Sequence, residues 1–207
     1  MFERLKRHWN QKRLKDPRFA FLFNTPSDDE VVCFDCETTG LNPRKDRIVS
    51  LSAIKIRGNE VLTSEALNLT FVQEAAISEE SIKIHWIRNE DTKAGLSEQE
   101  GIEAFLHFIG SRPLVGYYLE FDVAMVNQII KPWLGVTLPN DQIEVSSRYY
   151  DYKEEIIPKK IIDLTFDAIL KDLELPNLGQ HDAYSDAFMT SLIYIKLKSL
   201  ENYQGLY

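Results

Sequence analysis

Two carboxylates stand one residue apart near the end of an apolar stretch, at Asp35 and Glu37. Alternate residues of a β-strand face the same side, so both acids project together from a strand predicted over residues 31–36. Like charges side by side repel, and an unpaired buried charge is costly, which favours a cation between them. Carboxylate oxygens are suited to Mg²⁺ or Mn²⁺. Taken alone, the pair is also compatible with a solvated strand end that carries two ordinary acids.

The same stretch contains the chain's two cysteines, Cys33 and Cys36. Residues three apart on a strand point to opposite faces, so these thiols cannot share a ligand. A zinc site needs further ligands at matching spacing, and the sequence has no second cysteine pair. A redox pair of this spacing normally opens a helix, whereas this one ends a strand. We therefore expect two small buried side chains and assign the chemistry to the acids.

Two further acids and a histidine have settings that indicate a role. Asp122 follows a short apolar stretch and shares one helical face with apolar residues that continue to Trp133. An N-cap is the alternative explanation for Asp122, because aspartate is favoured there. Asp186 begins a stripe that runs to Leu197, and capping does not explain an acid inside the predicted helix. His181 precedes Asp186 by five residues, near the predicted helix start.

The elements that must position these residues indicate an α/β protein with a mixed sheet covered by helices. Strands are predicted first, and strands and helices then alternate. The best boundary is the polar stretch 24–30, which separates a basic N-terminal extension (residues 1–25, predicted helical) from the body (residues 26–207). The predicted strands are 31–36, 48–56, 62–71 and 114–117, and the predicted helices are 100–109, 122–133, 163–173 and 182–200.

Composition limits the classes of protein to consider. The 207 residues fit one domain with a small appendage, and 44% hydrophobic residues supply a core. No apolar run reaches the roughly 18 residues that a membrane span requires, and no apolar signal segment opens the sequence. Two cysteines are too few for a disulfide scaffold, so a cytoplasmic location is expected.

The charge of the chain is unevenly distributed. Residues 1–18 contain seven Lys or Arg residues and two acids, a net charge of +5, so the rest carries −13 of the total of −8. Phe2, Leu5 and Trp9 recur there at near-helical spacing. Such a head is suited to nucleic acid phosphates or to a groove on a protein partner. The alternative is a solvated helix that packs a few apolar residues on the body.

Four sequence stretches resemble the motifs of the DEDD-type 3′–5′ exonucleases. They are Phe34–Gly40 (FDCETTG), Val115–Val126 (VGYYLEFDVAMV) and His181–Ala187 (HDAYSDA), with a shorter likeness at Ile82–Ile87 (IKIHWI). The histidine five residues before the last aspartate matches the histidine-bearing branch. That branch includes the proofreading epsilon subunit of bacterial DNA polymerase III. The resemblance covers roughly residues 30–200.

This resemblance implies a ribonuclease-H-like fold and two divalent cations, Mg²⁺ or Mn²⁺. The implied metal ligands, which are also catalytic, are Asp35, Glu37, Asp122 and Asp186, with His181 as the catalytic base. The implied reaction is hydrolysis of phosphodiesters from the 3′ ends of DNA, releasing nucleoside 5′-monophosphates in proofreading or repair. The alternatives are an exoribonuclease acting on RNA 3′ ends and a non-catalytic nucleic-acid-binding module. A protein partner that binds the basic head is a further expectation.

The resemblance also implies contacts with the terminal nucleotide. The turn Thr38–Gly40 and the side chain of Leu41 would hold that nucleotide, and His85 and Phe121 would line the same pocket. For His85, a histidine packed in the core is the alternative. The sequence departs from many relatives at Tyr117-Tyr118, where they have a His-Asn pair. Because asparagine there helps to position the nucleotide, the departure puts substrate preference in doubt.

Overall fold

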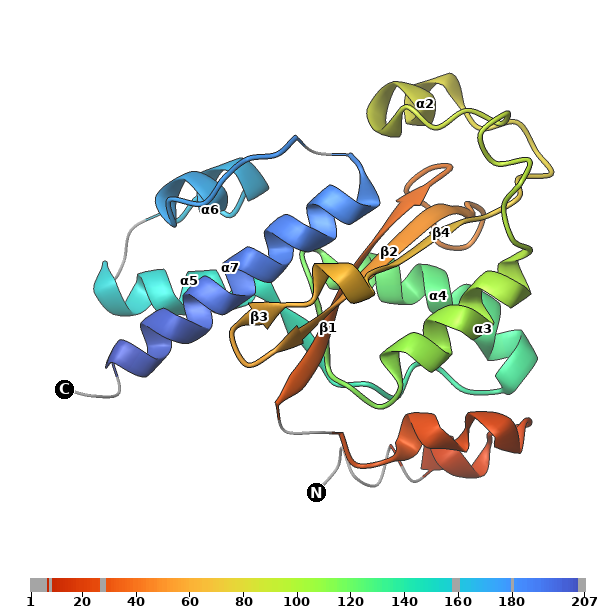
Figure 1. Cartoon of the computed structure of the whole chain (residues 1–207), viewed down its shortest axis with the longest axis horizontal. Helices are drawn as coiled ribbons and strands as arrows, with labels where there is room; N and C mark the ends of the chain where they lie inside the picture. Colours follow the sequence, from red (N-terminus) through yellow and green to blue (C-terminus); the bar gives the residue numbers. More distant parts are fainter. Residues whose placement is uncertain (1–6, 8, 27–28, 158–160, 180, 205–207) are drawn as a thin grey trace.

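The computed structural model describes residues 7, 9–26, 29–157, 161–179 and 181–204. Within these ranges a sheet lies between two groups of helices (Figure 1). The strands are β1 (Glu30–Thr38), β2 (Ile48–Arg57), β3 (Glu60–Val61), β4 (Leu67–Thr70), β5 (Leu114–Gly116) and β6 (Gln142–Glu144). The helices are η1 (Pro17–Phe23), η2 (Thr63–Glu65), α2 (Glu79–His85), α3 (Glu98–Ile109), α4 (Leu119–Leu134), α5 (Val145–Ile156), α6 (Phe166–Asp172) and α7 (Ala183–Gln204).

The sheet is mixed, and its strand order is β3-β2-β1-β5-β6, with β4 also paired to β2. β1 is antiparallel to β2, whereas β5 runs parallel to β1 and to β6. Helices α3 and α4 cover one face and α5, α6 and α7 cover the other (Figure 1). The predicted α/β class and mixed sheet between helices are confirmed.

Strand β1 divides its side chains between the two faces as its alternation requires. Phe34 and Cys36 pack in the core beneath α3 and α4, whereas Cys33 packs in the core beneath α7. Both cysteines are buried free thiols on opposite faces, as predicted. Asp35 and Glu37 therefore face the side of α7, and the β1–β2 register shifts between Glu37 and Thr38. Such irregularities redirect a strand and are frequent beside active sites.

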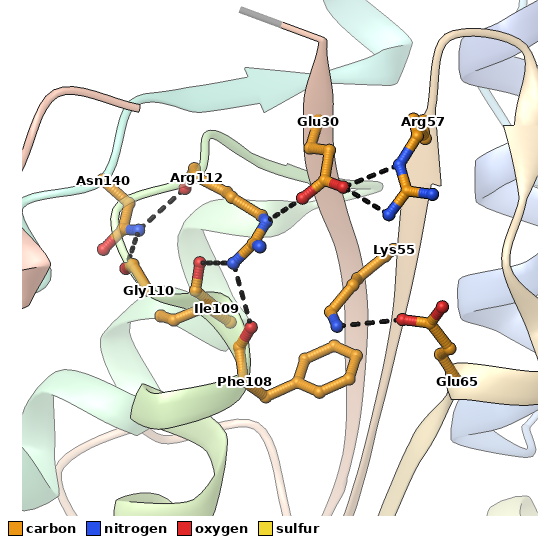
Figure 2. Close-up of polar contacts among 9 residues, drawn as sticks. All are labelled: Glu30, Lys55, Arg57, Glu65, Phe108, Ile109, Gly110, Arg112 and Asn140. Atoms are coloured by element: carbon orange, nitrogen blue, oxygen red, sulfur yellow. Dashed lines mark hydrogen bonds and ion pairs between the residues drawn. The ribbon is translucent and has the colours of Figure 1, made fainter. Parts of the chain in front are cut away.

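At the opposite end of β1, ion pairs connect neighbouring elements (Figure 2). The Glu30 carboxylate accepts from Arg57 Nε at 2.8 Å and from Arg112 Nε at 2.6 Å. Lys55 Nζ lies 3.1 Å from Glu65 and 4.9 Å from the centre of the Phe108 ring. The start of β1 is thus held to β2 and to the segment that follows α3.

Several element boundaries differ from the prediction. The predicted strand 62–71 is wrong in part, because η2 interrupts it and the part of it that pairs with β2 as a strand is β4. Helix α4 begins at Leu119 rather than at residue 122, and its N-cap is Tyr118, so the N-cap explanation for Asp122 is wrong. The sequence patterns did not predict α2, α5 or β6.

The N-terminal segment packs on the body where the structure describes it. Phe19 and Leu22 in η1 are fully buried in the same core as β1 and α4. Lys15 N–H donates to Leu134 O at 2.9 Å, and Lys15 Nζ donates to Pro132 O at 3.0 Å. Trp9 is 65% exposed, whereas Phe2 and Leu5 lie outside the described residues. None of the described helices has the length and apolar character needed to cross a membrane.

Candidate active site

Three acids from two elements meet beside the carboxyl end of β1. Asp35, Glu37 and Asp186 each offer one oxygen, and these oxygens all lie within 4.8 Å of one another. Strand alternation places the first two on one side, and α7 carries the third. The inward stripe predicted after Asp186 is confirmed, because Met189, Thr190, Ile193 and Leu197 are all buried.

Asp122 lies outside this group of three but is bound to the strand that carries two of its members. Its Oδ1 accepts a 3.0 Å hydrogen bond from Cys36 N–H. Because β5 ends at Gly116, β1 has no β5 partner at this level, and the carboxylate takes the place of a ladder carbonyl. Asp122 is 4% exposed, in the first turn of α4. The fourth predicted ligand is therefore buried against the backbone between Asp35 and Glu37.

Burial and mutual repulsion raise the pKa values of the acids in the site. Burial raises the pKa of Glu37 to about 7, and the charges of Asp186 and Asp182 add to this shift. Burial also raises the pKa of Asp122 to about 8, although the hydrogen bond from Cys36 opposes this shift. The pKa of Asp35 lies well above its usual value because of burial first and then the charge of Asp122. Each carboxylate is therefore destabilised in its charged form unless a cation lies beside it.

Asp186 provides a direct test of whether a cation fits. Its Oδ2 accepts a 2.9 Å hydrogen bond from the backbone N–H of His181. Its Oδ1 is buried and has no hydrogen-bond partner among the described residues. A buried carboxylate oxygen without a donor is costly, whereas a cation satisfies it. The donor set of carboxylates also matches the preference of Mg²⁺ and Mn²⁺ for oxygen, so these residues fit divalent ions.

His181 is an exposed residue with a positive φ of 71°, a conformation that most side chains disfavour. This turn brings its backbone N–H onto Asp186. Asp182, which follows it, accepts from Ser185 N–H at 3.1 Å, as an N-cap side chain does. The histidine is therefore held by its backbone at the entrance to α7, next to one acid of the cluster.

The turn after β1 is fixed by hydrogen bonds rather than by core packing. Thr39 N–H donates to Arg47 O at 3.0 Å, and Arg47 N–H donates to Thr39 Oγ1 at 3.0 Å. A Cβ on Gly40 would lie 2.7 Å from Asp46 Oδ2, so the close approach of this carboxylate requires glycine. Ser81 Oγ donates to Thr39 O at 2.8 Å, which ties α2 to the same turn.

The predicted substrate residues differ in what they offer to a ligand. Thr38 is buried and donates from Oγ1 to Gly40 O, whereas Leu41 is 87% exposed. Phe121 is half-buried against the core. His85 is 6% exposed; its Nδ1 accepts from Ile87 N–H at 3.1 Å, and its buried Nε2 has no partner among the described residues. Burial lowers the pKa of His85, which favours the neutral ring with its proton on Nε2.

One acid of the site, Asp182, and the backbone conformation of Tyr118 were not predicted from the sequence. Asp182 lies close enough for its charge to raise the pKa of both Glu37 and Asp186. The Asp182-Ala183-Tyr184-Ser185 spacing is a helix-start signal that could have drawn attention to this acid. Tyr118 has a φ of 57° and is 65% exposed one helical turn before Asp122. No sequence signal indicates a tyrosine in this conformation.

In the comparison with protein-family models, residues 32–194 match the family described as "Exonuclease". A PolC-type DNA polymerase III of Caldanaerobacter subterraneus subsp. tengcongensis is 29% identical over 174 residues, which are 82% of this chain and 12% of that protein. The DNA polymerase III subunit epsilon of Aquifex aeolicus is 24% identical over 173 residues, 82% of this chain and 81% of that protein. The chain thus spans about an eighth of the PolC-type relatives that it matches.

Solved structures show the same fold at lower identity. The zinc-bound complex of E. coli ExoI with single-stranded DNA has a TM-score of 0.68 and 16% identity, covering 86% of this chain and 43% of that one. Cell-death related nuclease 4 has a TM-score of 0.71 and 13% identity, covering 83% of this chain and 64% of that one. At such identities these structures support the fold alone.

Proposed function

Because the chain belongs to the exonuclease family, whose model matches residues 32–194, we propose that it is a metal-dependent 3′–5′ exonuclease that acts on DNA ends. The observation that carries the proposal is the meeting of the Asp35, Glu37 and Asp186 oxygens within 4.8 Å. Phosphodiester hydrolysis needs a place where cations gather beside the scissile bond, and clustered buried carboxylates provide one. The family's relatives named as replication subunits favour DNA over RNA.

Asp35, Glu37, Asp122 and Asp186 would hold two divalent ions, Mg²⁺ or Mn²⁺. When bound, such ions neutralise the phosphate and promote ionisation of the attacking water. The buried Oδ1 of Asp186, unpartnered among the described residues, is a ligand atom that this role requires, and the Asp122 carboxylate lies against the backbone between the other two acids. The raised pKa values of these carboxyl groups describe the chain without ions, and nearby cations lower them.

The chain's own residues complete the reaction. His181, exposed beside Asp186, accepts the proton of the attacking water, as an imidazole does near neutral pH. The Thr38–Gly40 turn brings backbone close to the terminal nucleotide, and Leu41 offers an exposed apolar side chain to its base. The unpartnered Nε2 of His85 is available to donate to a substrate oxygen. Phe121 forms the half-buried wall nearby.

One assay tests the proposal. Single strands of DNA and RNA, labelled at the 3′ or the 5′ end, are incubated with Mg²⁺ or Mn²⁺ and their product sizes are followed over time. A 3′–5′ exonuclease releases the 3′ label at once as a mononucleotide and shortens the 5′-labelled strand one nucleotide at a time. Asp186→Asn, with the same side-chain shape but no charge, is the matched control and should be inactive.

Other outcomes of the assay would replace the proposal. Faster degradation of RNA than of DNA would make the enzyme an exoribonuclease, because the 2′-hydroxyl would then be tolerated or used. Binding without any cleavage in either metal would leave a non-catalytic nucleic-acid-binding module. Recruitment by a protein partner through the basic head stays a prediction. It is tested by deleting residues 1–20 and comparing the losses on long DNA and on a mononucleotide ester.

A further inference from the structure

The loop that follows the acid cluster also forms one wall of a separate groove. This groove has a volume of about 520 Å³. It lies between the β1–β2 loop, the start of α3 and the second half of α4. The lining residues are Arg44, Arg47, Glu98, Gln99, Gln128, Ile129, Pro132 and Trp133.

The side chains of the groove match the parts of a nucleotide. Two guanidinium groups, from Arg44 and Arg47, are suited to phosphate oxygens. The indole of Trp133 and the neighbouring Ile129 give a flat apolar wall on which a base can stack. The volume is within the range of small-molecule sites, about 300–1,000 Å³.

A buried polar atom in the same groove lacks a partner. Gln128 lines the groove, and its Oε1 is buried without a hydrogen-bond partner among the described residues. Leaving a buried acceptor unpaired costs about 1–3 kcal/mol, so a donor supplied by a ligand would be favourable. The exocyclic amino and ring N–H groups of nucleobases are donors of this kind.

Charge also distinguishes this surface from the rest of the body. The body carries a net charge of −13, whereas the β1–β2 loop contributes three exposed cations, Arg44, Lys45 and Arg47, against Asp46. Arg47 is paired with Glu98 at 3.3 Å in an exposed contact, a kind that is weak. No described carboxylate lies within ion-pair distance of Arg44. A polyanion repelled elsewhere therefore meets cations on the loop that follows the strand carrying Asp35 and Glu37.

The groove contacts the turn after β1 at one end and the N-terminal segment at the other. Arg47 is held by two hydrogen bonds to Thr39, within the turn that follows Glu37. At the other end the Phe19 ring meets Trp133 edge-on with ring centres 5.1 Å apart, and Lys15 Nζ donates to Pro132 O. The cations of the N-terminal head, Lys12, Arg13 and Lys15, are exposed there. Exposed cations thus occur at both ends of the groove, on the β1–β2 loop that follows the acid-bearing strand and on the N-terminal head.

We propose that this groove is a second nucleotide-binding subsite, which holds the single strand on the 5′ side of the nucleotide being removed. A backbone phosphate binds Arg44 and Arg47, and a base lies against Trp133 with its donor on Gln128. The inference rests on the proposed exonuclease function, because the strand that it binds is the one whose 3′ end lies at the acids. It explains how an acidic protein retains a polyanionic substrate.

The test compares oligothymidylates of 2, 4, 8 and 12 nucleotides, with the dissociation constant measured in Ca²⁺ at several salt concentrations. The double substitution Arg44→Gln/Arg47→Gln should weaken binding of the 12-mer by about tenfold. It should also remove most of the gain in affinity that comes with oligonucleotide length. Its plot of log Kd against log salt should be shallower by about 0.7 for each arginine. The matched control is Lys171→Gln/Lys196→Gln, which removes the same charge from α6 and α7 on the opposite face.

If the lysine control loses as much affinity for the 12-mer as the arginine variant does, the effect comes from the overall charge of the protein, and the subsite is overturned. An equal loss on the dinucleotide and the 12-mer would place the arginines at the acid cluster instead, and would also overturn it. Cleavage by the unaltered chain is measured in parallel in Mn²⁺. If that cleavage is absent, the proposed function fails. If cleavage is present and the length dependence survives in the arginine variant, only the subsite fails.

Two further measurements address the roles of Gln128 and Trp133 in the groove. Gln128→Leu should leave the thermal stability unchanged or higher, because an unpaired buried acceptor is removed, and should weaken the 12-mer. A loss of stability with unchanged affinity would assign Gln128 to structure alone and overturn its role. In the Trp9→Phe/Trp86→Phe background, only Trp133 emits indole fluorescence. The 12-mer should quench this emission and the dinucleotide should not; no quenching by the 12-mer would overturn the stacking contact.

Discussion

The buried carboxylate of Asp122 accepts a hydrogen bond from the backbone N–H of Cys36, at 3.0 Å, between the two acids of β1. One oxygen of this residue thus completes the backbone hydrogen bonding of the strand, and the same carboxylate is a metal ligand in the proposed function. Because α4 carries Asp122 and β1 carries its donor, this hydrogen bond also sets how far the helix lies from the strand. Asp122 therefore has both a structural role and a proposed catalytic role, and two substitutions at this residue can separate the two roles.

Asp122→Asn should remove nearly all turnover and leave the fold intact. The asparagine amide oxygen can still accept from Cys36 N–H, and the protonated carboxyl group that it resembles is favoured by the raised pKa of about 8. Asp122→Ala should also remove turnover but lower the free energy of unfolding by about 1–3 kcal/mol, because it leaves the buried N–H unpaired. Urea unfolding and nuclease assays measure the two effects. Equal stability of the two variants would show that the hydrogen bond contributes little.

Glu37→Gln should make the metal-free chain more stable at pH 8 and abolish its stabilisation by Mn²⁺. The folded-state pKa of Glu37 is raised from 4.5 to about 7, so the folded chain binds more protons than the unfolded chain between these values. Stability of the metal-free chain therefore falls as pH rises through this window. The glutamine variant loses the part of this dependence that Glu37 contributes, whereas the raised pKa values of Asp35, Asp122 and Asp186 keep the rest. Thermal unfolding at pH 5 and pH 8, with EDTA or Mn²⁺, measures both effects.

The control for this prediction is Glu174→Gln, an exposed carboxylate outside the cluster. It should behave as the unaltered chain at both pH values. A lower melting temperature of Glu37→Gln at pH 8 in EDTA would contradict the view that charge repulsion destabilises the metal-free site. A retained Mn²⁺ shift would contradict the assignment of Glu37 as a ligand.

The acids could be predicted because each lies on a regular element with a clear period. Asp35 and Glu37 are two apart on a strand, and Asp186 begins a helical stripe that is buried in the structure. Asp122 was predicted to face inward for the same reason. Its partner could not be predicted, because the hydrogen bond to Cys36 depends on where β5 ends. Periodicity gives the direction of a side chain but not the backbone atom that it meets.

The elements that were missed lack such a signal. Helix α2 has seven residues, and α5 buries only Val145 and Tyr149, so neither shows an apolar stripe. The predicted strand 62–71 has strand-like composition throughout, but the chain turns through η2 before it pairs as β4. The groove between the β1–β2 loop, α3 and α4 joins residues more than 80 positions apart, Arg44 and Gln128, which no local pattern relates.

Glu30→Gln should lower the free energy of unfolding at pH 7 by about 1–3 kcal/mol, because two charge-assisted hydrogen bonds are weakened. Hydrogen bonds from Arg112 and then Arg57 lower the pKa of Glu30 below its usual value (Figure 2). The contribution of Glu30 to stability is therefore complete above its unfolded-state pKa of 4.5 and is lost as pH falls through the lower folded-state value. The difference between the variant and the unaltered chain should shrink on acidification, as measured by urea unfolding from pH 7 to pH 3.

Glu65→Gln is the matched control for Glu30→Gln. Its side chain is 48% exposed and its one ion pair among the described residues is with Lys55, so the change should cost less than about 1 kcal/mol. A cost as large as that of Glu30→Gln would show that the two ion pairs do not differ in strength. A constant difference between Glu30→Gln and the unaltered chain across the whole pH range would contradict the lowered pKa.

Tyr118→Asn should leave stability unchanged or raise it slightly, and should tighten binding of a DNA 3′ end. The left-handed conformation at φ 57° is unfavourable for tyrosine and tolerated by asparagine, and the ring is 65% exposed, so little burial is lost. The substitution removes an edge-on contact between the Tyr118 and Tyr117 rings, whose centres lie 5.5 Å apart. The amide replaces the ring at the start of α4, one turn from Asp122, where it can donate to the terminal nucleotide.

The measurements for Tyr118→Asn are the melting temperature, the dissociation constant of a short oligonucleotide in Ca²⁺, and the affinity for Mn²⁺. Tyr117→Phe is the control, since it removes only the hydroxyl that donates to Leu164 O at 3.0 Å and keeps the neighbouring ring. That variant should bind the oligonucleotide as the unaltered chain does. Tighter oligonucleotide binding with unchanged Mn²⁺ affinity places position 118 in the nucleotide pocket. If neither constant changes, the side chain at position 118 does not contact the nucleotide, and the departure at Tyr117-Tyr118 has no bearing on substrate preference.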